Sequence, residues 1–167
     1  MRKRIASGVL ASALLALAPG PTEPREIGIE VLRGYLDRLG ASYVKHPKSE
    51  NAVVVTRTGN DRADRLDLYV ELREDHTLVL TAYAKEKDRY FSVSRAVNRE
   101  KLSERLLQAN HEAFATFFID SQGDIGARFT FTTENGVGFE AFRVAATELL
   151  RIADDYTPIL EDFMRKG

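Results

Sequence analysis

The chain has 167 residues, with 24 basic and 25 acidic side chains, a formal charge of −1 and 44% hydrophobic residues. Nine Phe and six Tyr add enough apolar surface for a real core, which excludes wholesale disorder, and the length favours one domain with a short appendage. The near-zero charge argues against a nucleic-acid-binding protein. The absence of cysteine excludes disulfides, thiol nucleophiles and Cys-based metal sites.

The N-terminal segment differs in character from the rest of the chain. Three basic residues at 2–4 precede an apolar, Ala/Leu-rich run over residues 5–18, and a cluster of Pro and Gly follows. This layout is typical of a secretory signal, and the run is shorter than the roughly 20 residues of a membrane-spanning helix. We predict that residues 1–24 are a signal peptide, cleaved after Ala18 or Ala13, or an uncleaved N-terminal anchor. Residues 25–167 would then form an exported, periplasmic or otherwise extracytoplasmic domain.

Helix and strand signals alternate from residue 25 onward. Apolar residues at helical spacing predict a helix over residues 29–39, with Gly40 as its stop. Two short strands are expected at residues 43–46 and 52–58. Strict alternation then predicts a half-buried strand over residues 66–72. Its apolar positions are Leu66, Leu68, Val70 and Leu72, and its other face carries Asp67, Tyr69 and Glu71.

The middle of the chain continues this pattern. Residues 74–84 supply a tight turn and a returning partner strand, and residues 90–93 suggest a further short strand. Asn98 is expected to cap a second helix. The apolar face of that helix is predicted to comprise Leu102, Leu106, Ala109, Ala113 and Phe117. A hairpin turn over residues 119–125 leads into a strand over residues 126–133.

The last predicted helix, residues 139–165, is the most regular element. Its apolar positions alternate spacings of four and three, at Phe142, Ala146, Leu149, Ala153, Tyr156, Leu160 and Phe163. Burial on the domain's own sheet is favoured for this stripe over an exposed partner surface. Pro158 predicts a kink. Helices and hairpins in this order predict an α+β domain, with about five to seven strands in a single antiparallel sheet covered by helices.

Two motifs suggest ligand sites and are better explained by structure. Gly136, Gly138 and Ala141 match a dinucleotide-binding fingerprint, but no acidic strand residue follows about 20 positions later, so a strand-to-helix turn is favoured. The acidic series Asp61, Asp64 and Asp67 is interleaved with arginine, which favours a solvated charged loop over a cation site.

The remaining residues supply no recognisable reaction chemistry. The three histidines, His46, His76 and His111, have no pair at metal-binding spacing, so a surface or half-buried role is expected for each. There is no Gly-x-Ser-x-Gly elbow and no P-loop. We therefore predict no catalytic residue, no cofactor-binding residue and no metal ligand, and expect a protein that is not an enzyme.

The second half of the chain resembles the YbjN family, a bacterial family described as sensory-transduction regulators with a type III secretion chaperone-like fold. The segments that carry the resemblance are residues 102–110, 118–125, 128–131 and 149–160. The resemblance implies a helix–strands–helix–strands–helix domain that is often a homodimer, binds protein segments and has no known active site.

These observations favour a non-enzymatic protein-binding, chaperone-like or regulatory module of the bacterial envelope, with a protein partner and no nucleic acid. Membrane contact is expected only through an uncleaved N-terminal segment. The alternative is an envelope carrier of a small apolar ligand or lipid, and an enzyme is the third hypothesis. Candidate contact residues on the strands are Tyr69, Tyr83, Tyr90 and Phe91, although sheet packing is the simpler role for each.

Overall fold

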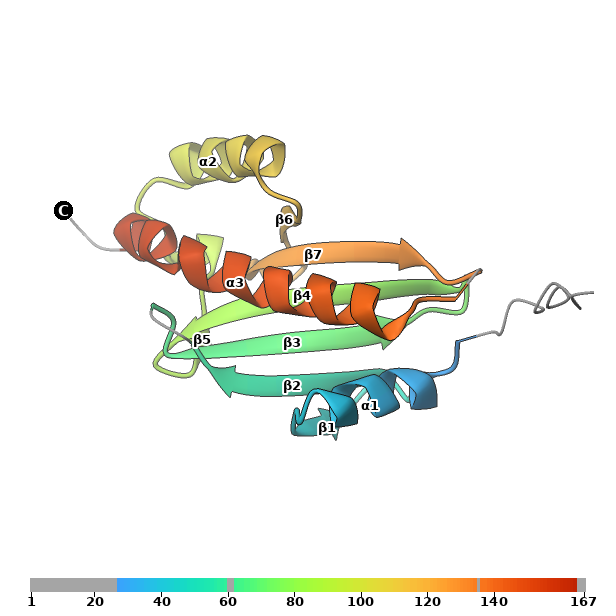
Figure 1. Cartoon of the computed structure of the whole chain (residues 1–167). Coiled ribbons are helices and arrows are strands. Elements are labelled where there is room, and N and C mark those ends of the chain that lie inside the picture. Colours follow the sequence, from blue (N-terminus) through green and yellow to red (C-terminus); the bar gives the residue numbers. More distant parts are fainter. Residues whose placement is uncertain (1–26, 60–61, 135, 165–167) are drawn as a thin grey trace, which may run out of the picture.

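The computed structural model describes residues 27–59, 62–134 and 136–164, so the predicted signal segment 1–24 lies outside the described residues. Within these described residues, three helices and seven strands follow one another (Figure 1). Their bounds are α1 Ile29–Arg38, β1 Tyr43–Lys45, β2 Ala52–Thr58, β3 Arg65–Leu72, β4 Thr77–Glu86, β5 Arg89–Tyr90, the 3-10 turn η1 Val93–Arg95, α2 Arg99–Glu112, β6 Thr116–Ile119, β7 Ile125–Thr132 and α3 Phe139–Met164.

The seven strands form a single antiparallel sheet. Its order is β1-β2-β3-β4-β7-β6, and β5 adds to the end of β4. β4 and β7 are neighbours although η1, α2 and β6 lie between them in sequence, so this pairing joins the two halves of the chain. The predicted α+β class, with one antiparallel sheet and the order helix–strands–helix–strands–helix, is confirmed.

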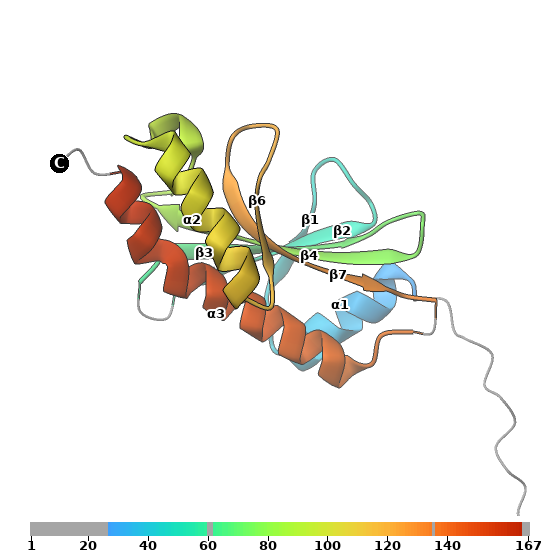
Figure 2. The same ribbon diagram turned by 90° about the horizontal axis from the view of Figure 1, so that it is seen from above.

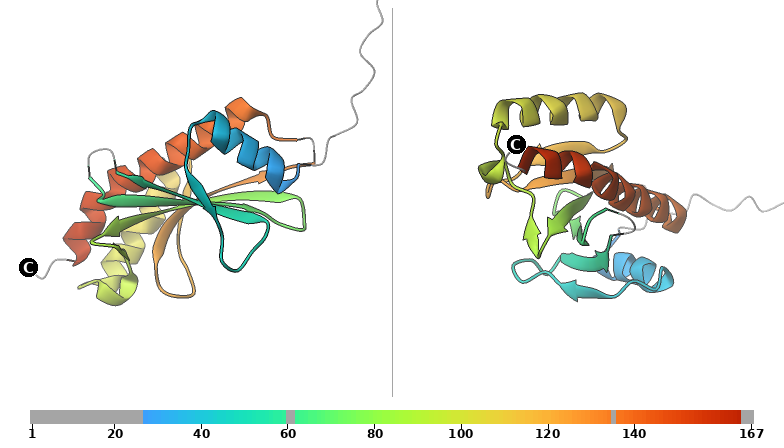
Figure 3. Two further views of the ribbon diagram at one scale, coloured as in Figure 1. Left: turned by 90° about the horizontal axis from the view of Figure 1, so that it is seen from below. Right: turned by 90° about the vertical axis from the view of Figure 1, so that its left-hand side faces the viewer.

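Alternation along the strands separates a covered face of the sheet from an open one. On β3, Leu66 and Leu68 are buried beneath the helices, and they lie opposite Ala84 and Ala82 of β4. Helices α1 and α3 lie on the same side of the sheet (Figure 3), and α2 packs against β6. Since the side chains of a strand point alternately to its two faces, the residues between the buried ones lie on the face that α1 and α3 leave open.

The apolar stripe of α3 is buried, as the sequence analysis favoured. Phe142, Leu149 and Leu160 are at most 3% exposed and belong to the hydrophobic core. The helix is continuous through Pro158, while the hydroxyl of Thr157 donates to the carbonyl of Ala153 at 3.1 Å. Figure 2 shows α3 extending along the sheet and past α2. None of the described helices is long and apolar enough to cross a membrane.

Local signals set the C-terminal end of α1 and the N-terminal end of α2 where predicted. Gly40 follows α1 with a φ of +65°, a left-handed conformation that glycine adopts without strain. Asn98 caps α2, since its side-chain oxygen accepts a hydrogen bond from the backbone N–H of Lys101 at 3.0 Å. Both caps satisfy backbone groups that a helix end leaves unpaired.

The prediction that the second helix extends to Phe117 is wrong. α2 ends at Glu112, and Phe117 lies on β6, a strand that the sequence analysis missed. The side-chain amide of Asn110 donates to the carbonyl of Phe117 and accepts from its N–H at 2.6 Å. It thus pairs both backbone groups of Phe117, as the backbone of a neighbouring strand does in a sheet. Phe117 is nevertheless buried, with its ring 4.3 Å from that of Tyr156.

Replacing Asn110 by alanine is expected to lower the free energy of unfolding by about 1–3 kcal/mol, because two partly buried backbone groups of Phe117 lose their partner. Urea denaturation followed by circular dichroism measures the change. Gln108→Ala, an exposed position on the same helix, is the matched control and is expected to change it by less than about 0.5 kcal/mol. Equal effects of the two substitutions would contradict a bridging role for Asn110.

Candidate interaction face

The open face of the sheet carries a cluster of aromatic side chains. Tyr69 of β3 and Tyr83 of β4 lie on this face with ring centroids 5.6 Å apart. The ring of Tyr90 on β5 is 5.0 Å from that of Tyr83, and the ring of Phe118 on β6 is 5.9 Å from it on another side. Arg128 of β7 places its guanidinium 4.1 Å from the centre of the Phe118 ring. We call these five residues the aromatic face.

A buried carboxylate fixes one side of this cluster. Asp67 is 3% exposed although it lies on the open face. Its two oxygens accept hydrogen bonds from the hydroxyls of Thr56 at 2.7 Å and Tyr90 at 2.5 Å. The carboxylate also forms an ion pair with the Lys85 amine at 2.7 Å. The Tyr69 hydroxyl lies 2.7 Å from that of Tyr90 and donates to it, since the Tyr90 proton is directed to Asp67. Tyr90 is therefore held in place by a strong charge-assisted bond, and Tyr69 is held through its hydrogen bond to Tyr90.

The environment shifts the pKa of several of these groups. Burial by itself raises the pKa of Asp67, but hydrogen bonds from Lys85, Tyr90 and Thr56 and the Lys85 charge outweigh it, so the pKa lies below its ordinary value. Burial and then the bond to Asp67 raise the pKa of Tyr90, and burial and then the Asp120 carboxylate raise that of Tyr83. Both tyrosines therefore remain neutral at physiological pH.

A glycine allows the rings to approach one another. Gly126 of β7 lies opposite both Tyr83 and Phe118 in the strand register. A Cβ atom at this position would lie 2.9 Å from a ring carbon of each, closer than real Cβ atoms come to neighbouring atoms. The absence of a side chain at Gly126 thus brings the aromatic residues of β4 and β6 into one continuous surface.

Three of the four predicted contact residues gather on this face, and the fourth does not. Tyr69, Tyr83 and Tyr90 are half-buried neighbours, with hydroxyls directed to Tyr90, Asp120 and Asp67 respectively. Phe91 is fully buried in the hydrophobic core. The chain turns after Tyr90, and the backbone carbonyl of Phe91 accepts a hydrogen bond from the N–H of Ile125. Phe91 therefore has the packing role that was the simpler expectation, and it is not a contact residue of this face.

Phe118 and Arg128 also belong to the face, although neither was among the predicted contact residues. Phe118 lies between the predicted helix and the predicted hairpin turn, and its side chain is directed to the open face only because β6 forms. Arg128 alternates with Phe129 along β7, a signal that could have identified it. Asp67 lies on β3, as predicted, but it is buried and not solvated, because it pairs with Lys85 in the neighbouring strand.

The other motifs have structural roles. Gly136 has a φ of +77° and lies in the turn between β7 and α3, as predicted for the glycine pair. Asp64 accepts a hydrogen bond from the backbone N–H of Lys87, and Asp61 lies outside the described residues. His76 and His111 are exposed and His46 is half-buried, with its ring 5.8 Å from that of Tyr69. In the described part of the chain, no three His, Asp or Glu side chains are grouped so as to hold a metal ion.

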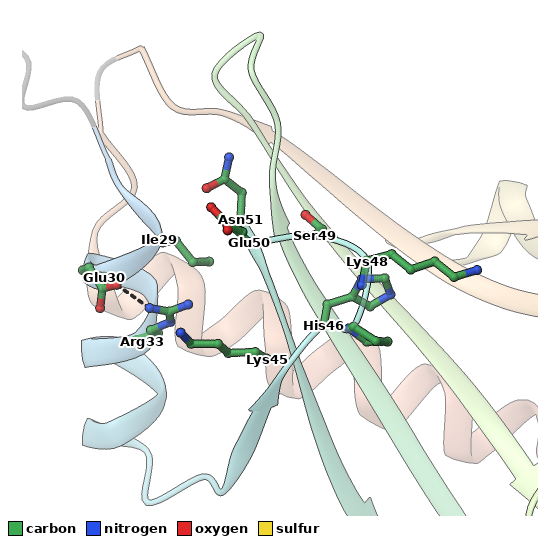
Figure 4. A pocket seen from close by; sticks show the side chains of 10 residues that line it. Ile29, Glu30, Arg33, Lys45, His46, Lys48, Ser49, Glu50 and Asn51 are labelled. Atoms are coloured by element: carbon green, nitrogen blue, oxygen red, sulfur yellow. Dashed lines mark hydrogen bonds and ion pairs between the residues drawn. The ribbon is translucent and has the colours of Figure 1, made fainter.

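A charged hollow of about 560 Å³ lies between α1 and the loop that joins β1 to β2. Figure 4 shows Arg33 of α1 and Lys45 of β1 directed toward the same space, with His46 and Lys48 further along the loop. Arg33 forms an ion pair with Glu30. The hollow is on the helix side of edge strand β1, and its lining includes no member of the aromatic face.

Comparison with known proteins identifies the fold. A chain from the crystal structure of the ExsC–ExsE complex superimposes with a TM-score of 0.55 and 15% sequence identity, covering 79% of this chain and 92% of that one. Neither the protein-family models nor the curated proteins contain a match to the sequence. The likeness confirms the predicted type III secretion chaperone-like fold, while membership of the YbjN family stays a prediction.

Proposed function

We propose that this protein is a non-enzymatic binding module that captures an extended segment of a partner protein on its aromatic face. The observation that carries the proposal is the composition of that face, in which Tyr69, Tyr83, Tyr90, Phe118 and Arg128 gather on the side of the sheet opposite α1 and α3. Tyrosine, phenylalanine and arginine are enriched in protein interfaces, and tyrosine and arginine supply many of the residues that dominate binding energy.

The rigidity of the face also supports this proposal. Side chains that are already ordered lose less conformational entropy when a partner binds, so each contact contributes more to affinity. The hydrogen bonds among Tyr69, Tyr90 and Asp67 provide such order before any partner arrives. The structural likeness to a chain of a two-protein complex, ExsC–ExsE, is consistent with protein binding.

Location and assembly complete the proposal. The basic and then apolar N-terminal segment supports export to the envelope, and the YbjN resemblance supports a chaperone-like or regulatory role as a homodimer. Sedimentation analysis of the purified protein is expected to give twice the mass of one mature chain. The mass of one chain is 18.7 kDa, or less where a signal peptide has been cleaved. Cell fractionation is expected to place the protein in the periplasm or on the inner membrane.

The test of the aromatic face is a double substitution, Phe118→Ala with Arg128→Ala, which leaves the hydrogen bonds of Asp67 intact. The partner is first identified by crosslinking and affinity capture of the full-length chain from envelope extracts, and its affinity is then measured by titration. We expect the double variant to weaken binding by about 30-fold or more, as loss of a hot spot does.

Phe114→Ala provides the matched control. Phe114 is the most exposed phenylalanine of the described chain at 68%, and it stacks on Phe129 on the helix side of the sheet. This substitution is expected to leave partner affinity unchanged. Undiminished binding by the Phe118/Arg128 variant, or a loss caused by Phe114→Ala alone, would refute the assignment of the partner to the aromatic face.

A further inference from the structure

One member of the aromatic face carries a charge that no described residue balances. Arg128 is half-buried, and its Nε atom is buried without a hydrogen-bond partner. Its guanidinium contacts the ring of Phe118, but it forms no ion pair and no hydrogen bond within the described part of the chain. The ring attracts the cation without supplying a counter-charge. The guanidinium can therefore still pair with an anion from a partner.

The other charged side chains on the open face of β3 and β4 differ from Arg128 in this respect, because each already has a counter-charge. The pairs are Arg65 with Asp88, Asp67 with Lys85, and Glu71 with Arg73. An incoming charged group would have to break one of these pairs in order to bind there. At Arg128 it would replace only water.

The carboxylate of Asp120, in the turn between β6 and β7, is also fully engaged. One of its oxygens accepts a hydrogen bond from the hydroxyl of Tyr83 at 3.1 Å. The other accepts from the backbone N–H groups of Gln122 at 2.8 Å and Asp124 at 2.9 Å. These bonds hold Asp120 in its own turn, and among the described residues it forms no ion pair with Arg128.

Arg128 begins a row of side chains that crosses the sheet. It lies opposite Thr81 of β4, which lies opposite Tyr69 of β3. The row continues through Val54 to Val44 of β1, which is 65% exposed. Since neighbouring strands are about 4.8 Å apart, the positions of Arg128 and Tyr69 are separated by about 10 Å, which about three residues of extended chain can span. A segment lying across the strands would thus contact the cation and the tyrosine together.

We propose that the partner segment carries an aspartate or glutamate that binds Arg128, with an apolar side chain about three positions away that packs against Tyr69. This inference rests on the proposed function and specifies the chemistry of the partner. A carboxylate matches the planar donors of a guanidinium in geometry and charge. The half-buried position strengthens the pair, because charges attract more strongly there than in bulk water. A basic segment is disfavoured, since it would bring a second cation against an unpaired one.

The experiment selects random peptides of about a dozen residues, displayed on phage, on the full-length chain. The enriched peptides are expected to share an acidic residue with an apolar one nearby. In titrations of one such peptide, replacing the acid by its amide should weaken binding about tenfold, and Arg128→Gln should weaken binding of the acidic peptide by a similar factor. The two changes together should cost little more than either alone, because they remove the same pair. Added salt should weaken binding of the acidic peptide to the unaltered chain more than to Arg128→Gln.

Arg73→Gln is the matched control, because it removes an arginine whose charge is already paired with Glu71. It is expected to change the affinity of the acidic peptide by less than about twofold. Phe118→Ala should weaken binding of the acidic peptide and its amide form alike, and thus reports binding to the face independently of charge. Circular dichroism verifies that each variant is folded.

The outcomes separate this inference from the proposed function. Peptides that need Phe118 but no acidic residue would overturn the inference and leave the proposed function standing. Acidic peptides that bind Arg128→Gln as tightly as the unaltered chain would also overturn it. If the selection yields no peptide whose binding depends on Phe118, the proposed function fails and the inference fails with it.

Discussion

Replacing Asp67 by asparagine is expected to lower the free energy of unfolding by about 3 kcal/mol or more, the scale seen when one partner of a buried ion pair is removed. The Lys85 side chain is only 15% exposed, so its charge would remain largely desolvated without the carboxylate. The hydroxyls of Thr56 and Tyr90 would also lose a charged acceptor. Urea denaturation at neutral pH measures the change.

Glu71→Gln is the matched control for this prediction. Glu71 lies on the same face of the same strand, but its ion pair with Arg73 is exposed, and such pairs contribute at most about 1 kcal/mol. The double substitution of Asp67→Leu with Lys85→Met should recover much of the stability, because it leaves no uncompensated charge. If Asp67→Asn and Glu71→Gln had equal effects, the ion pair would not be the source of the stability.

The same carboxylate predicts how stability depends on pH. The pKa of Asp67 is lower in the folded state than in the unfolded chain, so the unfolded chain binds the proton more readily. The contribution of Asp67 is therefore complete above the unfolded pKa and is lost as pH falls through the folded pKa. Denaturation curves between neutral pH and strong acid should be less steeply pH-dependent for Asp67→Asn than for the unaltered chain.

Phe142→Ala is expected to cost about 3–5 kcal/mol, the usual range for truncating a fully buried phenylalanine. The ring has no exposed surface, and its centroid lies 5.6 Å from that of Tyr35, so it joins α3 to α1 above the sheet. Thermal and urea denaturation should both report the loss. Val144→Ala, 47% exposed on the same helix, should change stability by less than about 0.5 kcal/mol, and a similar effect at both positions would contradict the packing described for α3.

The elements that could be predicted from the sequence are those whose periodicity was unambiguous. The alternation of Leu66, Leu68 and Val70 identified β3 and the direction of Tyr69, and the spacing of Phe142 and Leu149 identified the buried stripe of α3. β6 could not be predicted, because the spacing of Ala109, Ala113 and Phe117 continues the helical period. The bonds from Asn110 to Phe117 belong to tertiary structure, which local spacing does not encode.

The candidate face was predictable only in part for a similar reason. The direction of Tyr69 and Tyr83 follows from each strand alone, but their contact depends on the register between β3 and β4. The burial of Asp67 depends on Lys85 from the next strand and on Tyr90 from a third. Pairings across strands set the chemistry of this surface, and a single strand's sequence does not specify them.

The two outermost strands of the sheet are short, three residues in β1 and four in β6. Backbone groups along such brief edges offer an incoming chain little main-chain pairing, and this brevity discourages fibre-like self-association. A bound segment of a partner protein would then be recognised mainly by the shape and chemistry of its side chains. The affinity should accordingly depend strongly on the amino acids of that segment, and less on main-chain pairing with the sheet.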